Sequence, residues 1–174
     1  MKFNKIRNLV TAALFSAIIC VATFVVKIPS PATNGYFNLG DCFVILSGLL
    51  LSPVYGALAA GIGSALADIL SGYVQYAPAT FIIKALMALS VYMIMKVIPK
   101  SKKTLAVICS GITAEAIMVL GYFAYEAVIL KYGLAAAGSI FSNVMQGLVG
   151  IAASTAVYTV IKNNKTLSEF FRKG

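Results

Sequence analysis

Eleven polar side chains that could bind a small molecule lie within or beside strongly apolar segments of this sequence. They combine four carboxyl groups, one amine, four amides and two phenols, so together they offer charges, hydrogen bonds and aromatic surface. They are Asn38, Asp41, Asp68, Gln75, Tyr76, Lys84, Glu115, Tyr122, Glu126, Asn143 and Gln146. We predict that they line a substrate-binding pocket.

Catalytic chemistry finds little support in the same residues. The chain contains no His and no Trp, and it lacks a GxxxxGK[ST] phosphate loop, a GxSG nucleophile motif, an HExxH motif and any acidic cluster at metal-ligand spacing. Glu115 and Glu126 are about 16 Å apart by helix rise, too far to act on one bond together. We therefore expect no enzymatic activity, no catalytic residues, no cofactor and no metal.

The composition predicts an all-α integral membrane protein. Hydrophobic residues make up 60% of the 174 residues and charged residues only 11%, with a mean hydropathy of +0.93, whereas soluble domains have about 45–50% apolar and 25% charged residues. Cys20, Cys42 and Cys109 lie in apolar segments without CxxC spacing and are interpreted as packing residues.

Apolar segments of nearly spanning length recur along the whole chain, which we expect to form a single six-helix membrane domain over residues 1–174. The expected spans are approximately residues 8–26, 37–51, 54–72, 79–98, 104–130 and 139–161. Pro and Gly mark residues 27–36 as a loop, and the polar tail after residue 161 is long enough for a surface-lying turn.

The basic residues predict the orientation. Six spans put both termini on one side of the membrane, and eleven of the 14 Lys and Arg residues fall on that side: Lys2, Lys5, Arg7, Lys96, Lys100, Lys102, Lys103, Lys162, Lys165, Arg172 and Lys173. By the positive-inside rule both termini are expected to be cytoplasmic. This asymmetry accounts for the net charge of +9 without nucleic acid as a partner.

Orientation and helix rise then give each polar residue a depth. Apart from Glu115 near mid-membrane, the other ten fall in the outer half of the bilayer, and Lys84 lies about two turns below the outer surface. Charged groups at helix centres cost about 2.5–3.5 kcal/mol each on insertion scales, so they tend to face a cavity or a partner charge. We predict a pocket open to the outside rather than a channel, in which Lys84 pairs with Asp68 or Glu126 when no ligand is present.

Structural roles remain open for the same residues. Asp41 could cap a helix at the membrane boundary, Asp68 and Lys84 could form a structural ion pair, and Glu115 could simply be packed. Asn143 and Gln146 could hydrogen-bond to neighbouring helices.

Two small-residue patterns predict close helix contacts. Gly56, Ala60 and Ser64 precede Asp68 at intervals of four, a spacing that lets helix backbones approach closely. In the first apolar segment, Ala13 and Ala17 form an AxxxA pattern that either packs within the fold or docks another membrane protein.

Three stretches resemble a known family. They are the AxxxA pattern, "GYFNLGDCFVILSGLLLSPVYGALAAGIGSALADILSGY" at residues 35–73, and "APATFIIKAL" at residues 77–86. These are similar to the substrate-binding S components of energy-coupling factor (ECF) vitamin transporters, in the branch named for riboflavin that also includes hydroxymethylpyrimidine and pyridoxine carriers. The motif similarity is confined to about residues 8–90.

The resemblance implies a B vitamin or vitamin precursor as substrate, bound from outside, in a prokaryotic cytoplasmic membrane. It also implies a complex with one membrane coupling protein and two ATPase subunits, with Ala13 and Ala17 touching the coupling protein. It assigns no role to Glu126, Asn143 or Gln146, whose assignment rests on depth alone. Two other classes stay open: an autonomous proton- or ion-coupled carrier, and a structural membrane protein that binds no small molecule.

Overall fold

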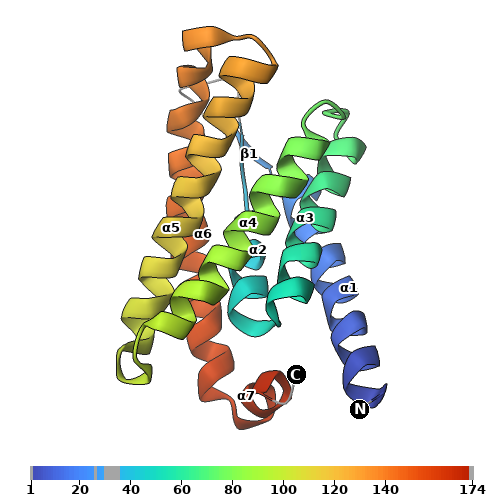
Figure 1. Cartoon of the computed structure of the whole chain (residues 1–174), viewed down its shortest axis with the longest axis vertical. Helices are drawn as coiled ribbons and strands as arrows, with labels where there is room; N and C mark the ends of the chain where they lie inside the picture. The colour runs from blue at the N-terminus through green and yellow to red at the C-terminus, as the bar shows by residue number, and fades with distance from the viewer. Residues whose placement is uncertain (1, 26, 30–35, 173–174) are drawn as a thin grey trace.

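The computed structural model describes residues 2–25, 27–29 and 36–172, which are mainly helical (Figure 1). The helices are α1 (Lys2–Val25), α2 (Gly40–Leu50), α3 (Pro53–Leu70), α4 (Ala77–Val97), α5 (Lys103–Ala124), α6 (Gly138–Asn163) and α7 (Lys165–Arg172). Short helical turns are η1 (Lys100–Lys102), η2 (Tyr125–Ile129), a π-helical continuation of α5, and η3 (Gly133–Ala137). The expectation of a helical protein suited to a membrane is confirmed.

Five of the helical segments are long and apolar enough to cross a membrane, whereas α2 is not. With 11 residues, α2 is about 16 Å long, roughly half the thickness of a bilayer's hydrocarbon core. The short apolar segment at residues 37–51 was expected to be one of the six spans, and Pro53 after it does start the next helix. Because α2 is short, its N-terminus lies inside the helix bundle rather than at its edge.

Two short strands precede α2, where the sequence predicted only a loop. β1 (Lys27–Pro29) and β2 (Tyr36–Asn38) pair antiparallel, with Lys27 opposite Asn38. Residues 30–35 of the predicted loop lie outside the described residues. The pairing leads the chain from the end of α1 to the buried start of α2.

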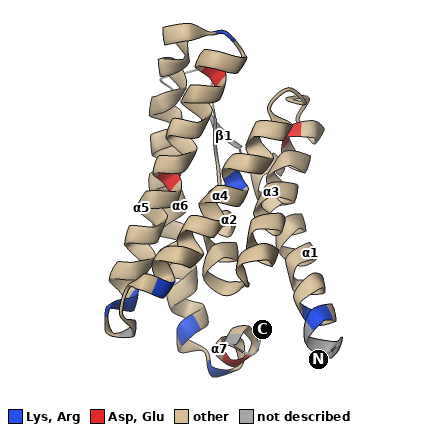
Figure 2. Cartoon of the chain, in the orientation of Figure 1, with Lys and Arg blue, Asp and Glu red and all other residues tan. Residues whose placement is uncertain are grey.

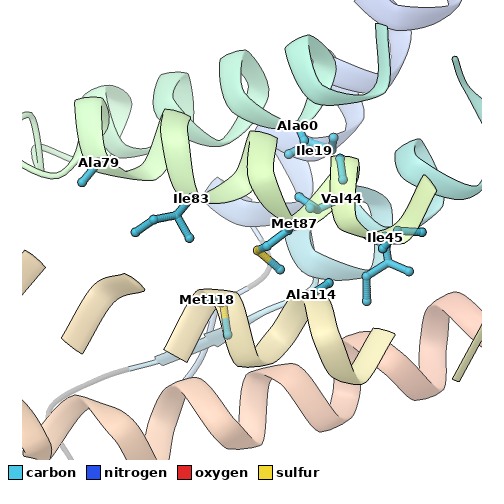
Figure 3. Packing of buried hydrophobic residues seen from close by; sticks show 11 residues of the cluster. Ile19, Val44, Ile45, Ala60, Ala79, Ile83, Met87, Ala114 and Met118 are labelled. Carbon is cyan, nitrogen blue, oxygen red and sulfur yellow. The ribbon is translucent and has the colours of Figure 1, made fainter. Parts of the chain in front are cut away.

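The short helix α2 is the centre of the packing. It contacts α1, α3, α4, α5 and α6, and Val44 and Ile45 on it are fully buried. Figure 3 shows Met87 of α4 and Met118 of α5 pointing into the same apolar layer beside it. The lipid-facing surface carries exposed aliphatic side chains instead, as expected for a protein whose solvent is lipid.

Small residues on α3 allow the predicted close approach of helices. A Cβ atom placed on Gly63 would lie 2.5 Å from the Ser16 backbone oxygen of α1, and one on Gly61 would lie 2.8 Å from the Phe81 ring of α4. Ala60 is fully buried. The seam therefore holds α3 against α1 and α4, its two main neighbours.

Basic residues gather at the end of the bundle that carries both ends of the chain (Figure 2). The tail forms the amphipathic helix α7 at this end, where the Phe171 and Phe15 ring centroids are 6.3 Å apart and the Arg7 guanidinium lies 5.5 Å from the Phe170 ring centroid. The basic residues used to predict the orientation are thus concentrated at one end of the structure.

We predict that Gly63→Ala lowers the free energy of unfolding by about 1–3 kcal/mol, because the added methyl group overpacks the contact between α3 and α1. Thermal unfolding of the purified protein in detergent measures the effect. Gly138→Ala is the matched control, because a Cβ atom there has nothing within 4 Å. Equal midpoints for the two variants would contradict the described α1–α3 contact.

Candidate ligand-binding site

A buried ion pair joins α2 to α4. The Lys84 ammonium bonds to Asp41 Oδ1, and these residues are only 5% and 1% exposed. Asp41 lies in the first turn of α2, where unsatisfied backbone N–H groups and the helix dipole stabilise a negative charge. Lys84 Nζ also lies 3.1 Å from the sulfur of Met118 on α5.

Amide side chains extend this pair into a network. Gln146 Nε2 of α6 donates a hydrogen bond to Asp41 Oδ2 (2.5 Å), and Asn38 Nδ2 of β2 donates to Gln146 Oε1 (2.8 Å). Asn38 Oδ1 in turn accepts a hydrogen bond from the N–H of Gly40, the first residue of α2 (2.9 Å). Because the buried carboxylate of Asp41 has partners on both oxygens, its charge is well compensated.

A cavity of about 250 Å³ lies next to this network, toward the end of the bundle away from the chain termini. Most of its wall comes from four parts of the chain: the last turns of α3, the α3–α4 connection, the end of α5 and the start of α6. The lining residues are Thr23, Asn38, Ser64, Asp68, Tyr73, Tyr76, Thr80, Lys84, Tyr122, Glu126, Ser139, Ser142, Asn143 and Gln146. The lining is rich in hydroxyl, amide and charged groups, as a site for a small polar molecule requires.

Hydrogen bonds fix one side of the cavity. The π-helical turn η2 carries Glu126, which accepts from the Tyr76 hydroxyl (3.3 Å) and the Ser139 hydroxyl (2.6 Å). The Thr80 and Tyr122 hydroxyl groups are 2.9 Å apart. Burial and the Glu126 charge raise the pKa of Tyr76 above its usual value, so Tyr76 remains a hydrogen-bond donor.

The part of the cavity wall formed by α3 contains polar atoms without partners among the described residues. Asp68 Oδ2 and Ser64 Oγ of α3 are both buried and have no hydrogen-bond partner among the residues that the structure describes. Ser64 is only 2% exposed. Buried polar atoms are rarely left unsatisfied, so these two are available to a ligand.

The structure brings eight of the eleven sequence-predicted substrate residues around this one cavity. They are Asn38, Asp68, Tyr76, Lys84, Tyr122, Glu126, Asn143 and Gln146. Asp41, Gln75 and Glu115 do not line it. Asp41 lies behind Lys84, and Gln75 is exposed, with its backbone carbonyl accepting a hydrogen bond from the Tyr125 hydroxyl.

The expected partner of Lys84 was wrong. Lys84 pairs with Asp41, not with Asp68 or Glu126. Asp41 was expected near the membrane boundary because residues 37–51 were counted as one of the six spans. Since α2 is only half as long as a span, Asp41 lies deep enough to meet Lys84.

Glu115 is buried between α5 and α6 instead of facing the cavity. It is 6% exposed, and a Cβ atom placed on Gly147 or Gly150 would lie 3.0 Å from its carboxylate. Neither of its oxygens has a hydrogen-bond partner among the described residues. Its seven-residue spacing from Tyr122 keeps it on the same face but about 10 Å farther along the helix, below the cavity.

Six lining residues were not among the predicted ones, although helical spacing along the sequence could have indicated some of them. They are Thr23, Ser64, Tyr73, Thr80, Ser139 and Ser142. Thr80 lies midway between Tyr76 and Lys84 at intervals of four, on the same helix face. Ser64 was assigned to the packing seam, and nothing in its spacing separates the two roles.

Ala13 and Ala17, the predicted docking residues, are exposed on α1. Leu14 and Ile18 beside them are 57% and 42% exposed. Of the two interpretations of the AxxxA pattern, packing within the fold is therefore excluded for the described residues. This face meets lipid or another membrane protein.

The fold and the cavity together define a multi-pass membrane protein with a polar cavity toward one end of its helix bundle. Residues 3–163 match the family described as "ECF-type riboflavin transporter, S component", and the chain belongs to this family. The resemblance noted from the sequence is thereby confirmed.

Two further comparisons agree. A solved structure described as "Structure and mechanism of the S component of a bacterial ECF transporter" has the same fold, with a TM-score of 0.71 and 23% sequence identity, covering 91% of this chain and 97% of that one. A Pyrococcus woesei protein, named only "Uncharacterized protein in gap 3'region", is 33% identical over 145 residues, covering 83% of this chain and 94% of the relative.

We predict that Lys84→Met destabilises the protein by about 3–5 kcal/mol, because it leaves the Asp41 carboxylate buried without its cation. The double variant Lys84→Met/Asp41→Asn should recover part of this loss, because the amide is neutral and still hydrogen-bonds to Gln146. Equilibrium unfolding in mixed micelles compares the variants. A double variant no more stable than Lys84→Met would contradict the pairing.

Proposed function

We propose that this chain is the substrate-specificity (S) component of an ECF-type ABC importer, which binds a B vitamin or vitamin precursor from outside the cell for ATP-driven uptake by partner subunits. The observation that carries the proposal is that eight of the predicted residues line one polar cavity in a chain of this family. The sequence contains no phosphate loop of its own, so ATP hydrolysis would come from the partners.

The size of the cavity bears on the substrate. Pockets for drug-sized ligands measure about 300–1,000 Å³, and this one measures about 250 Å³. That volume favours a single heteroaromatic ring, as in pyridoxine or hydroxymethylpyrimidine, over riboflavin with its three fused rings and ribityl chain. Tyr73, Tyr76 and Tyr122 supply aromatic surface for such a ring.

The charge distribution supports an orientation in the prokaryotic cytoplasmic membrane. Basic residues concentrate at the end that carries both chain termini (Figure 2), which the positive-inside rule assigns to the cytoplasm. The cavity lies toward the other end and would open to the outside, as an import protein requires.

The exposed face of α1 is the proposed contact with the coupling protein. Ala13 and Ala17 present small side chains there, and such a pattern allows a partner helix to approach closely. The full complex would contain this coupling protein and two ATPase subunits.

Uptake measurements test the assignment. In cells that lack the endogenous vitamin carriers, we expect labelled pyridoxine or hydroxymethylpyrimidine to accumulate only when this chain is expressed together with the coupling protein and both ATPases. Uptake by this chain alone that follows the proton gradient would favour an autonomous carrier. No uptake of any B vitamin under either condition would favour a structural role.

We predict that Ala13→Trp lowers co-purification of the coupling protein at least about ten-fold, because a large side chain prevents close helix approach, while ligand affinity stays unchanged. Quantitative pull-down with and without the variant measures this. Leu120→Trp is the control, because Leu120 is a lipid-exposed residue on α5, 66% exposed. Equal losses for both variants would contradict a specific α1 interface.

A further inference from the structure

We propose that the substrate carries a positively charged nitrogen and that Asp68, together with Ser64, binds it. This inference rests on the proposed function, because it specifies the chemistry of the molecule that the same cavity accepts. It follows from how the charges around the cavity are already paired.

Lys84, the one cation among the described lining residues, is already neutralised by Asp41. Among the described lining residues the charged groups are Lys84, Asp68 and Glu126. Lys84 is held by Asp41 from behind the cavity wall. Thr80 and Lys84 lie close enough to interact with Asp68, but Lys84 forms its ion pair with Asp41. Negative charge is therefore in excess among these described groups. Such a field favours a cationic ligand over a neutral or anionic one.

The carboxylates of Glu126 and Asp68 differ in whether their oxygens already accept hydrogen bonds. Both oxygens of Glu126 accept hydrogen bonds, one from Tyr76 and the other from Ser139. Asp68 Oδ2 is buried and has no partner among the described residues. A buried carboxylate oxygen without a partner is costly, and a ligand N–H⁺ group would satisfy it. Asp68 is thus the anchor, whereas Glu126 positions Tyr76 and Ser139.

Ser64 is an independent indication of the same subsite. It lies one helical turn before Asp68 on α3, is 2% exposed and lines the same cavity, and its hydroxyl also lacks a partner among the described residues. A hydroxyl oxygen can accept a second hydrogen bond from the same ammonium or iminium group. Two unsatisfied atoms of neighbouring turns thus point to one donor-rich ligand group.

The surroundings reinforce the preference for a cation. Asp68 lies in the last turns of α3, where the helix dipole places partial negative charge that favours cations. The rings of Tyr73, Tyr76 and Tyr122 also line the cavity, and aromatic faces attract a cation further. Lys131, on the α5–α6 connection, is exposed and does not line the cavity.

Matched ligand pairs test the inference on the unmodified protein. Pyridoxamine and pyridoxine differ by a protonated amine in place of a hydroxyl group, as do the aminomethyl and hydroxymethyl forms of the pyrimidine precursor. Isothermal titration calorimetry in nanodiscs should give a Kd at least about ten-fold lower for the amine in at least one pair, as expected for a charge-assisted hydrogen bond.

Variants then assign the preference to Asp68. Asp68→Asn should weaken binding of the preferred amine about ten-fold or more and change that of its hydroxyl partner by less than about three-fold. Ser64→Ala should weaken the amine in the same direction. Glu169→Gln on α7 is the charge-matched control, because it removes one carboxylate at the opposite end of the bundle, and should leave both affinities unchanged.

The outcomes separate this inference from the proposed function. Binding of pyridoxine, hydroxymethylpyrimidine or riboflavin with no preference for an amine, or an amine preference that survives in Asp68→Asn, overturns the cation subsite and leaves the vitamin site in place. Failure of the wild-type protein to bind any of these compounds overturns both.

Discussion

The buried ion pair between Lys84 and Asp41 is the interaction on which the rest of this structure depends. Removing two charges from water costs several kcal/mol per ion, and their attraction offsets this only when further hydrogen bonds satisfy the remaining atoms. Gln146 provides such a bond to Asp41. Since these residues come from α4, α2 and α6, the pair fixes how three helices meet. Loss of either charge would leave the other without compensation in the centre of the bundle.

The ion pair also determines the character of the cavity. It engages Lys84, the lysine among the described residues of the cavity wall, so the rest of the described wall is acidic and hydroxyl-rich. Beyond the pair lie apolar residues such as Ile45, Met87 and Val91, which are almost completely buried. The buried carboxyl group of Glu115 lies between α5 and α6 in the same region.

The helices and most of the site could be predicted from sequence because both have regular physical signals. Apolar length identified the spans, and helical spacing placed Tyr122 with Glu126, and Asn143 with Gln146, on cavity-facing surfaces. The partner of Lys84 could not be predicted in this way, because it depends on α2 being half a span long and on a pair of strands before it. Glu115 was expected either to face the pocket or to be packed, and the structure packs it between α5 and α6, below the cavity. A pattern of small residues could not predict that Ser64 lines the cavity, because the same serine also lies in the packing seam of α3.

We propose that the cavity between α3, α4, α5 and α6 binds a vitamin. Mass spectrometry of small molecules released from the wild-type protein tests this directly, with the protein purified from cells grown with a mixture of B vitamins and their precursors. We expect one heteroaromatic vitamin or precursor in near-stoichiometric amount, lost when cavity residues such as Asn143 are replaced by bulky side chains. No released compound, together with no binding when the same panel is added back, would contradict it.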